Sequence, residues 1–394
     1  MGIAMLAIID RVLEDEVPRD RLALLLKHFS EIPDEREPWR VLFPLTEVLL
    51  LVVCGTICSC DDFDDIVAWG EAHLSFLRRF APFHHGVPGE RWLRILLNRI
   101  DPLLFKRCFE GWVAAMWPDR PEFIAIDGKT ARRTLDRKNG VKALHTLSAY
   151  ATTARLVLAQ QCVPEKTNEI TAIPELLDDL AERGQLKGAL VSIDAMGCQV
   201  EIADKIVENG ADYLLALKGN QPTLEADVAD YFRSAPKGET IVKTTVEKGH
   251  GRIETRTYAV SGHVDWIGSD RSYPGRPRFS NIRAVLMAQD RTEYADRSTF
   301  DARYFISSAS PDIERLSKGV RGHWGVESMH WLLDVEFADD LSRYRAGSGA
   351  QNMAVVRRFA LGLVRANKAK GSVKTRRKKA GWNPAFLQQI LQLK

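Results

Sequence analysis

The chain has 394 residues, of which 45% are hydrophobic and 27% charged, and this ordinary globular balance excludes fibrous and broadly disordered proteins. Its longest apolar runs, 3–9 and 48–54, are far shorter than the roughly 18 residues of a membrane span, so we expect neither a span nor secretion. The net charge of +3 hides an asymmetry, because residues 341–394 contain 13 Lys and Arg and no acidic residue. A segment this basic indicates a polyanionic partner.

The first third of the sequence predicts helices. Apolar residues recur at helical spacing from Leu22 to Phe29, the run 44–60 is typical of a buried helix, and Asp101-Pro102 starts a helix toward Trp117. We therefore predict an all-helical N-terminal domain over residues 1–118, which would bind DNA or dimerise. The six cysteines form no disulfide framework, which indicates a reducing, cytosolic compartment. The close group Cys54, Cys58 and Cys60 is interpreted as buried thiols rather than a zinc site.

The pattern changes at Pro121, where short β-like runs begin to alternate with helices. Strands are expected at 123–126, 144–152, 156–163, 190–193 and 213–217, with helices at 174–182, 200–208, 312–337 and 352–366. This alternation is typical of an α/β fold. The predicted units are the first part of an α/β domain (119–239), a β-rich insertion (240–310), the completion of the α/β domain (311–367) and a basic helical C-terminal arm (368–394).

Two aspartates stand at the ends of two similar apolar runs. Asp127 follows Phe-Ile-Ala-Ile and Asp194 follows Leu-Val-Ser-Ile. If the two strands are neighbours, the carboxylates meet, and two anions at close range raise one pKa strongly or require a cation between them. Each residue fits equally well as an ordinary strand-end aspartate or as the Asx residue of a turn.

The helix expected at 312–337 adds a third carboxylate. At about 100° per residue, Glu327 falls in the middle of an apolar stripe made of Leu316, Val320, Trp324 and Trp331. A carboxylate aimed at the core needs a proton, a basic partner or a metal. This position favours a Glu that joins the aspartate pair from another element.

A zinc site on the same helix is the competing interpretation. His323, Glu327, His330 and Asp334 are spaced by four, three and four residues, but one helix cannot easily surround a tetrahedral ion and the H-E-x-x-H spacing is absent. Three carboxylates from three elements instead supply hard oxygen ligands for Mg²⁺ or Mn²⁺. Such a set suits two-metal phosphodiester chemistry.

The sequence resembles the H-repeat-associated, ISAs-type insertion-sequence transposases, a family of DDE enzymes, from about Glu31 to the C-terminus. The resemblance rests on ordered blocks: AIDGKTARRT from Ala125, LHTLSAY from Leu144, EKTNEITAIPELL from Glu165, IDAMGCQ from Ile193, DYLLALKGNQPTL from Asp212, KGHGRIETR from Lys248, RGHWGVESMHWLLDVEF from Arg321 and RRKKAGWN from Arg376.

The resemblance implies a ribonuclease H-like mixed sheet whose β-rich insertion precedes the helix carrying the third carboxylate. It implies that Asp127, Asp194 and Glu327 are catalytic and bind Mg²⁺, with Mn²⁺ as a substitute. It also implies a transposase that cleaves double-stranded DNA at element ends and transfers the strands to a target, as a homodimer or higher synaptic assembly. Related enzymes often carry Lys seven residues after the Glu, where this chain has Asp334, as an extra ligand or as part of the site wall.

Basic and polar residues near these blocks are candidate DNA contacts, because cations adjoining an acidic site can hold phosphates. The candidates are Lys129, Arg132, Arg133, Lys218, Asn220, Lys248, His250, Arg252, Arg256, Arg321, His323, Lys374, Arg376, Arg377, Lys378 and Lys379. Asn220 also fits as a helix N-cap. The last five form the predicted phosphate-binding arm, for which a solubilising tail is the alternative.

Two other functions fit the same sequence. One is a plain metal-dependent nuclease, and the other is a catalytically silent DNA-binding protein descended from a transposase. In either case the sequence predicts a cytoplasmic, nucleoid-associated protein without a small-molecule cofactor and without a membrane partner.

Overall fold

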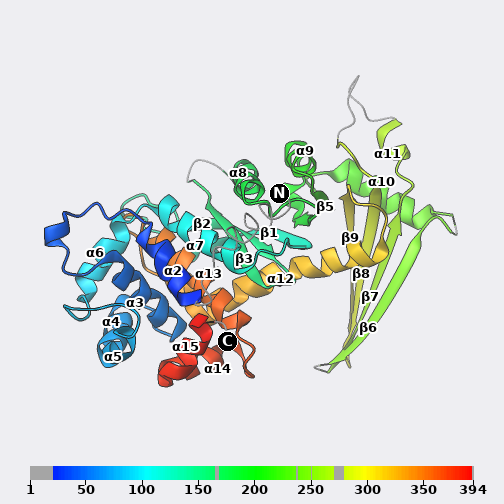
Figure 1. Ribbon diagram of the computed structural model, residues 1–394. Coiled ribbons are helices and arrows are strands. Elements are labelled where there is room, and N and C mark those ends of the chain that lie inside the picture. The colour runs from blue at the N-terminus through cyan, green and yellow to red at the C-terminus, as the bar shows by residue number, and fades with distance from the viewer. Residues whose placement is uncertain (1–20, 165–167, 237, 250, 270–278, 393–394) are drawn as a thin grey trace, which may run out of the picture. The chain divides into compact units, whose positions relative to one another are not determined.

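The computed structural model describes residues 21–164, 168–236, 238–249, 251–269 and 279–392 (Figure 1). The chain divides into two compact units, one made of residues 1–117 and 346–394 and the other of residues 118–345. Within the described ranges, no helix is long and apolar enough to cross a membrane.

Over residues 21–117 and 346–392, the first unit contains helices and no strand, as the sequence predicts for its N-terminal part. They are α2 (Arg21–Ser30), α3 (Leu45–Ile57), α4 (Phe63–Ala72), α5 (Leu74–Leu77), α6 (Glu90–Arg99), α7 (Pro102–Met116), α13 (Gly349–Ala366), α14 (Val373–Trp382) and α15 (Pro384–Gln392), with a 3₁₀ turn at Pro38–Arg40. Helix α7 begins where Asp101 and Pro102 predict, because the Asp101 carboxylate accepts a hydrogen bond from the Leu103 amide at 2.7 Å.

The C-terminal segment belongs to this helical unit, which differs from the predicted division. Phe359 of α13 packs its ring against Phe109 and Trp112 of α7, at centroid distances of 4.4 and 4.7 Å. Asn352 donates from its side chain to the carbonyls of Leu97 and Ile100 at 2.8 and 3.0 Å. Helix α13 therefore completes the helical core instead of the α/β domain, because its apolar face matches the aromatic face of α7.

The close cysteine group is buried in this unit, as predicted. Cys54, Cys58 and Cys60 are at most 9% exposed. Burial raises the pKa of the Cys60 thiol to about 12, so at neutral pH it stays protonated.

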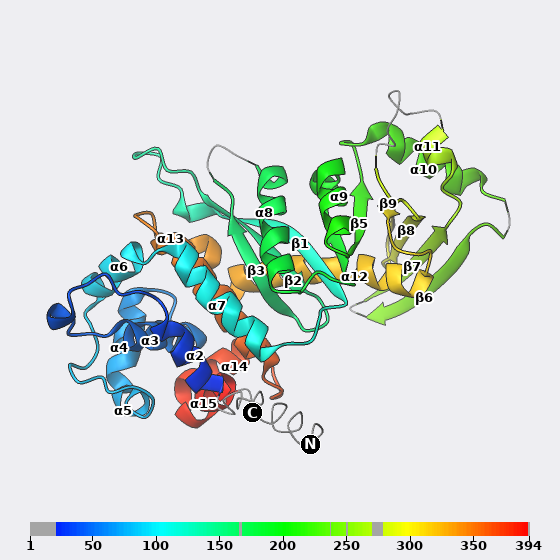
Figure 2. The same cartoon turned by 45° about the horizontal axis from the view of Figure 1, so that its top comes forward.

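The second unit is built on one nine-stranded mixed sheet with the order β3-β2-β1-β4-β5-β9-β8-β7-β6 (Figures 1 and 2). The strands are β1 (Phe123–Ala131), β2 (Leu144–Ala151), β3 (Leu156–Cys162), β4 (Leu190–Ile193), β5 (Asp212–Leu217), β6 (Ile241–Gly249), β7 (Arg252–Ser261), β8 (Ala284–Glu293) and β9 (Ser298–Ser307). Strands β1, β4 and β5 are parallel to one another, and the remaining neighbours are antiparallel. The apolar runs ending at Asp127 and Asp194 are thus adjacent parallel strands.

The β-rich segment extends this sheet rather than forming a separate body. Strand β9 returns beside β5, and β6 to β9 form two long hairpins. Helices α10 (Pro222–Ser234) and α11 (Trp266–Ser269) accompany this part of the sheet.

Helices cover both faces of the sheet. Helices α8 (Glu169–Glu182) and α9 (Val200–Glu208) lie on one face, and the long α12 (Ile313–Phe337) crosses the other (Figures 1 and 2). Leu316 and Val320 of α12 join a core with residues of β1, β4, β5 and β7 to β9. A single helix therefore connects the three parallel strands to the hairpin strands.

Candidate active site

The two aspartates lie side by side on adjacent strands, Asp127 in the middle of β1 and Asp194 directly after β4. Ile126 pairs with Ile193 across the two strands, and each is followed directly by an aspartate. The Asp194 carboxylate accepts hydrogen bonds from the amides of Met196 and Gly197 at 3.1 and 3.4 Å, which fixes its direction. Burial raises the pKa of Asp194, and the charge of Asp127 raises it further.

Helix α12 places two histidines next to these aspartates and their strands. His330 Nδ1 lies 3.3 Å from Asp127 Oδ2, and His323 Nδ1 lies 3.0 Å from the Ser192 hydroxyl of β4. Burial acts to raise the pKa of Asp127, but the hydrogen bond with His330 and the nearby imidazoles lower it overall. Asp127 is thereby kept ionised beside a second carboxyl group that is harder to ionise.

Glu327 is linked to the two aspartates through their shared electrostatic effect on His323. Burial lowers the pKa of His323, and this effect is opposed by the negative charges of Asp127, Asp194 and Glu327. The His323 imidazole therefore interacts electrostatically with all three carboxylates. The residues of α12 in the competing zinc interpretation have different partners. His323 contacts Ser192, His330 contacts Asp127 and Asp334 pairs with Lys129.

The predicted apolar stripe around Glu327 is wrong. Leu316 and Val320 are buried, but Trp324 and Trp331 are 37% and 59% exposed, and Glu327 itself is exposed. The face that packs on the sheet is rotated toward Val326, Met329 and Leu333. Helical periodicity offers both stripes, and only the position of the sheet decides between them. Glu327 thus lies at the border between the packed face and solvent, where a ligand can reach it.

The buried Lys129 and the half-buried Asp334 form an ion pair next to this site. Lys129 is two residues beyond Asp127 on β1, so both side chains point toward α12. Its Nζ lies 2.5 Å from Asp334 Oδ1 and 3.5 Å from Asp340 Oδ1, and the residue is 8% exposed. This contact puts Asp334 on the wall of the site, and it leaves Lys129 paired inside the protein rather than open to solvent.

The opposite face of β1 carries a pair that the sequence did not single out. His145 Nε2 lies 2.6 Å from Glu169 Oε1, and His145 Nδ1 lies 2.7 Å from the Thr130 hydroxyl. The charge of Glu169 is a further cause that raises the pKa of Asp194. The pair packs over Gly128, where a Cβ atom would stand only 2.2 Å from Glu169 Oε1. The only signal in the sequence is that His145, Glu169 and Gly128 fall in blocks of the family resemblance.

Sequence comparisons agree with this geometry. Residues 118–363 match the family described as "Transposase DDE domain", and residues 26–113 match "DDE_Tnp_1-associated". The chain belongs to the DDE transposase family. The first five strands of its sheet, with the flanking helices, form the expected ribonuclease H-like fold.

Relatives of this transposase cover nearly its whole length. "Putative transposase YncI" of Escherichia coli O157:H7 is 36% identical, over 93% of this chain and 94% of that protein. "H repeat-associated putative transposase YhhI" of E. coli K12 is 34% identical, over 94% and 98%. A solved structure of a piggyBac transposase synaptic complex with hairpin DNA has a TM-score of 0.41 and 11% identity, over 95% of this chain and 79% of that chain.

Several of the predicted DNA contacts are exposed to solvent. Arg132 and Arg133 follow β1, with exposed side chains, and Lys218 is exposed in the loop after β5. Asn220 does not cap α10, because Gln221 holds the N-cap position without a capping bond. Instead Asn220 donates to the Ala195 carbonyl, which ties this loop to the one that carries Asp194.

The predicted DNA contacts on the hairpins and on α12 differ in solvent exposure and in ion pairing. Lys248 is exposed, whereas Arg256 is 12% exposed at its side chain and is bound by Glu247 and Glu254. Arg252 pairs with Glu254 at 2.5 Å and stays 40% exposed. Arg321 is exposed, while His323 is packed against Ser192; His250 lies outside the described residues.

The predicted basic arm is helical, as expected, but its helices α14 and α15 carry buried residues, so the five basic residues divide into two groups. Lys374, Lys378 and Lys379 are exposed on α14. Arg376 donates to the Val364 and Asn367 carbonyls at the end of α13, at 2.8 and 2.6 Å. Arg377 is 2% exposed and donates to the Thr56 carbonyl at 2.8 Å, a position that does not fit the predicted phosphate contact.

Proposed function

We propose that this transposase cleaves DNA at the ends of an insertion-sequence element and joins the freed 3′ ends to target DNA, with Asp127, Asp194 and Glu327 as its catalytic carboxylates. The observation that supports this proposal most strongly is the pairing of β1 with β4, which brings the two aspartates together under the helix that carries Glu327. The proposal rests on family membership for the reaction and on this geometry for the residues.

Family membership implies a divalent metal, and the donor set fits one. All three candidate ligands are carboxylates, the hard oxygen donors that Mg²⁺ and Mn²⁺ prefer. Burial first, and then the charge of Asp127, raise the pKa of Asp194, and a cation between the two carboxylates would oppose both effects. Among the described residues no three potential ligands are clustered tightly enough to hold an ion, so we expect the exposed Glu327 to move when metal and DNA bind.

The proposed ligands are Asp127, Asp194 and Glu327, and Mg²⁺ ions held there would activate the attacking oxygen and stabilise the leaving one. The protein's own residues prepare this site. His330 holds Asp127 in its ionised form, the amides after Asp194 orient that carboxylate, and the Lys129–Asp334 pair fixes β1 against α12. Because the two aspartates are held on or directly after paired strands, these two ligands need little reorganisation, and the movement falls to Glu327.

The proposed substrate is double-stranded DNA. Exposed cations beside the carboxylates, including Arg132, Arg133 and Lys218, would hold the backbone on either side of the cut. Joining two ends requires at least two active sites, so we expect a dimer or a higher assembly. Work on chromosomal DNA would place the protein in the cytoplasm, at the nucleoid.

The proposal is tested by strand cleavage on a plasmid carrying the DNA that natively flanks this gene, in Mg²⁺ and in Mn²⁺. The wild type should cut at the flanking repeats, and Asp194→Asn should abolish cutting while leaving DNA binding intact. The matched control is Asp230→Asn, which changes an exposed aspartate of α10 in the same unit. Equal cutting by both variants would refute the assignment.

A silent DNA-binding protein is the second candidate, because one relative is named "Inactive transposase YbfQ", at 39% identity over 17% of this chain and 80% of that protein. This function predicts that wild type and Asp194→Asn bind DNA alike and that neither nicks it in either metal. A plain nuclease is separated by the fate of the 3′ ends, which it would release without joining them to a target.

A further inference from the structure

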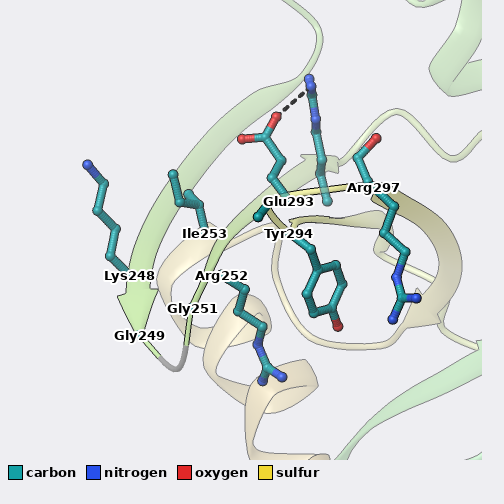
Figure 3. A pocket seen from close by; sticks show the side chains of 11 residues that line it. Lys248, Gly249, Gly251, Arg252, Ile253, Glu293, Tyr294 and Arg297 are labelled. Atoms are coloured by element: carbon teal, nitrogen blue, oxygen red, sulfur yellow. Dashed lines mark ion pairs between the residues drawn. The ribbon is translucent and has the colours of Figure 1, made fainter.

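The tips of the two long hairpins border an open hollow of about 830 Å³ (Figure 3). Four cationic residues and one acidic residue, Glu293, line it, so its lining carries a net charge of +3. The cationic residues are Lys248, Arg252, Arg291 and Arg297. We call this hollow the tip groove.

The side chains of the tip groove divide between the two faces of the sheet. Figure 3 shows Arg252, Tyr294 and Arg297 extending to the same side, while Glu293 points away from them. The strand register gives the reason: Ile253 pairs with Glu293, so Arg252, one residue earlier, shares the other face with Tyr294. Arg291 lies 2.6 Å from Glu293 and is on the same face of the sheet as Glu293. Glu293 and Arg291 therefore neutralise each other on one face, while Arg252 and Arg297 lie on the other face.

The face of Arg252 and Tyr294 is also the face on which α12 packs. Tyr258, which shares the orientation of Arg252 along β7, lies in the core formed with Leu316 and Val320. Six residues separate Tyr258 from Arg252, which corresponds to about 20 Å along a strand. The tip groove thus lies on the same side of the sheet as Glu327, but far enough away to serve in binding rather than in chemistry.

The chemistry of the tip groove suits a phosphodiester backbone. The Arg297 guanidinium lies over the Tyr294 ring, 4.9 Å from its centroid, which orders this arginine before any ligand arrives. Arg252 uses its Nε on Glu254 and remains 40% exposed. A guanidinium presents several donors in a plane that matches two phosphate oxygens. Gly249 lines the same hollow, and a Cβ there would meet nothing, so a bulky backbone can approach.

We propose that the tip groove binds the sugar-phosphate backbone of double-stranded element-end DNA through Arg252 and Arg297, so that the duplex runs along the α12 face toward the carboxylates. This inference rests on the proposed function for its substrate. It adds Tyr294 and Arg297, which lie in the connection between β8 and β9, to the candidate DNA contacts that the sequence indicates on and around the β6–β7 hairpin.

The test uses the full chain and compares Arg252→Gln/Arg297→Gln with Arg291→Gln. The control removes a cation from the same tip but from the opposite face, and all three positions are exposed, so folding should be preserved. Affinity for a duplex carrying the flanking repeat is measured against salt concentration. Loss of two phosphate contacts should reduce the slope of log K against log salt by about 1.8, and the control should leave the slope unchanged.

The outcomes separate this proposal from the proposed function. Weaker binding by the double variant, with wild-type cleavage at saturating DNA, is the expected result. Equal slopes for the double variant, the control and the wild type would overturn the tip groove, as would a wild type without salt-dependent binding to the duplex. If the slope falls as expected but the wild type never cuts, the proposed function fails and the tip groove stands.

Discussion

Gly128 is the position where one added carbon should disturb the site most. In Gly128→Ala the new Cβ would stand 2.2 Å from Glu169 Oε1 and 2.7 Å from His145 Nε2, against an ordinary contact near 3.4–4 Å. The Glu169 side chain can rotate away, so the overlap is relieved by breaking its 2.6 Å contact with His145. Losing a hydrogen bond to a charged group costs about 1.5–3 kcal/mol, and replacing a strand glycine returns about 0.5–1 kcal/mol.

We therefore expect Gly128→Ala to lower the free energy of unfolding by about 1–2 kcal/mol, measured by urea denaturation. Gly219→Ala is the control, because a Cβ there meets nothing within 4 Å. In a Glu169→Ala background only the 2.7 Å overlap with His145 Nε2 remains and no His145–Glu169 hydrogen bond can be lost, so Gly128→Ala should cost clearly less than in the wild-type background. A cost that is equal in both backgrounds, or no cost in the wild-type background, would refute this reasoning.

The remaining predictions concern the tail and the buried histidine. Replacing Lys374, Lys378 and Lys379 by Gln should flatten the salt dependence of DNA binding without changing stability, as read from binding titrations and urea melts of the same protein. Arg377→Ala should instead lower the free energy of unfolding by about 1–3 kcal/mol, because the Thr56 carbonyl loses a buried donor; a wild-type urea midpoint would contradict the burial of this side chain. His323 has a lowered pKa in the fold, so its contribution to stability is present above about pH 6.5 and declines as the pH falls below it. Urea midpoints between pH 7.5 and pH 5.5 should therefore fall less in His323→Gln than in the wild type.

The sequence predicts the parts of this site that depend on strand order and family blocks. Two equivalent apolar runs that each end in aspartate become neighbouring parallel strands, so the meeting of Asp127 and Asp194 follows from local pattern plus one assumption about pairing. Which face of α12 packs on the sheet could not be predicted in the same way. Periodicity supplied an apolar stripe through Trp324 and Trp331, and the sheet selected another, because packing depends on the partner surface and not on the helix alone.

The fate of charged residues was likewise hidden from the sequence. The basic run 376–379 suggests an exposed arm, yet Arg376 and Arg377 donate to carbonyls inside the helical unit while their lysine neighbours face solvent. A helix turns successive residues by about 100°, so a run of like charges on a packed helix must place some members inward. Arginine suits those inward positions because its planar donors can satisfy several carbonyls at once.

Four consecutive residues of β1, 127–130, make contacts on both faces of the sheet that affect the aspartate pair. Because side chains alternate along a strand, Asp127 and Lys129 face α12, and Gly128 and Thr130 face α8. One face thereby receives His330 and Asp334, which set the charge of the first carboxylate and anchor the helix that bears Glu327. The other face receives the His145–Glu169 pair, whose charge acts on Asp194. A change on either face should therefore be felt at the aspartate pair, even when neither aspartate is touched.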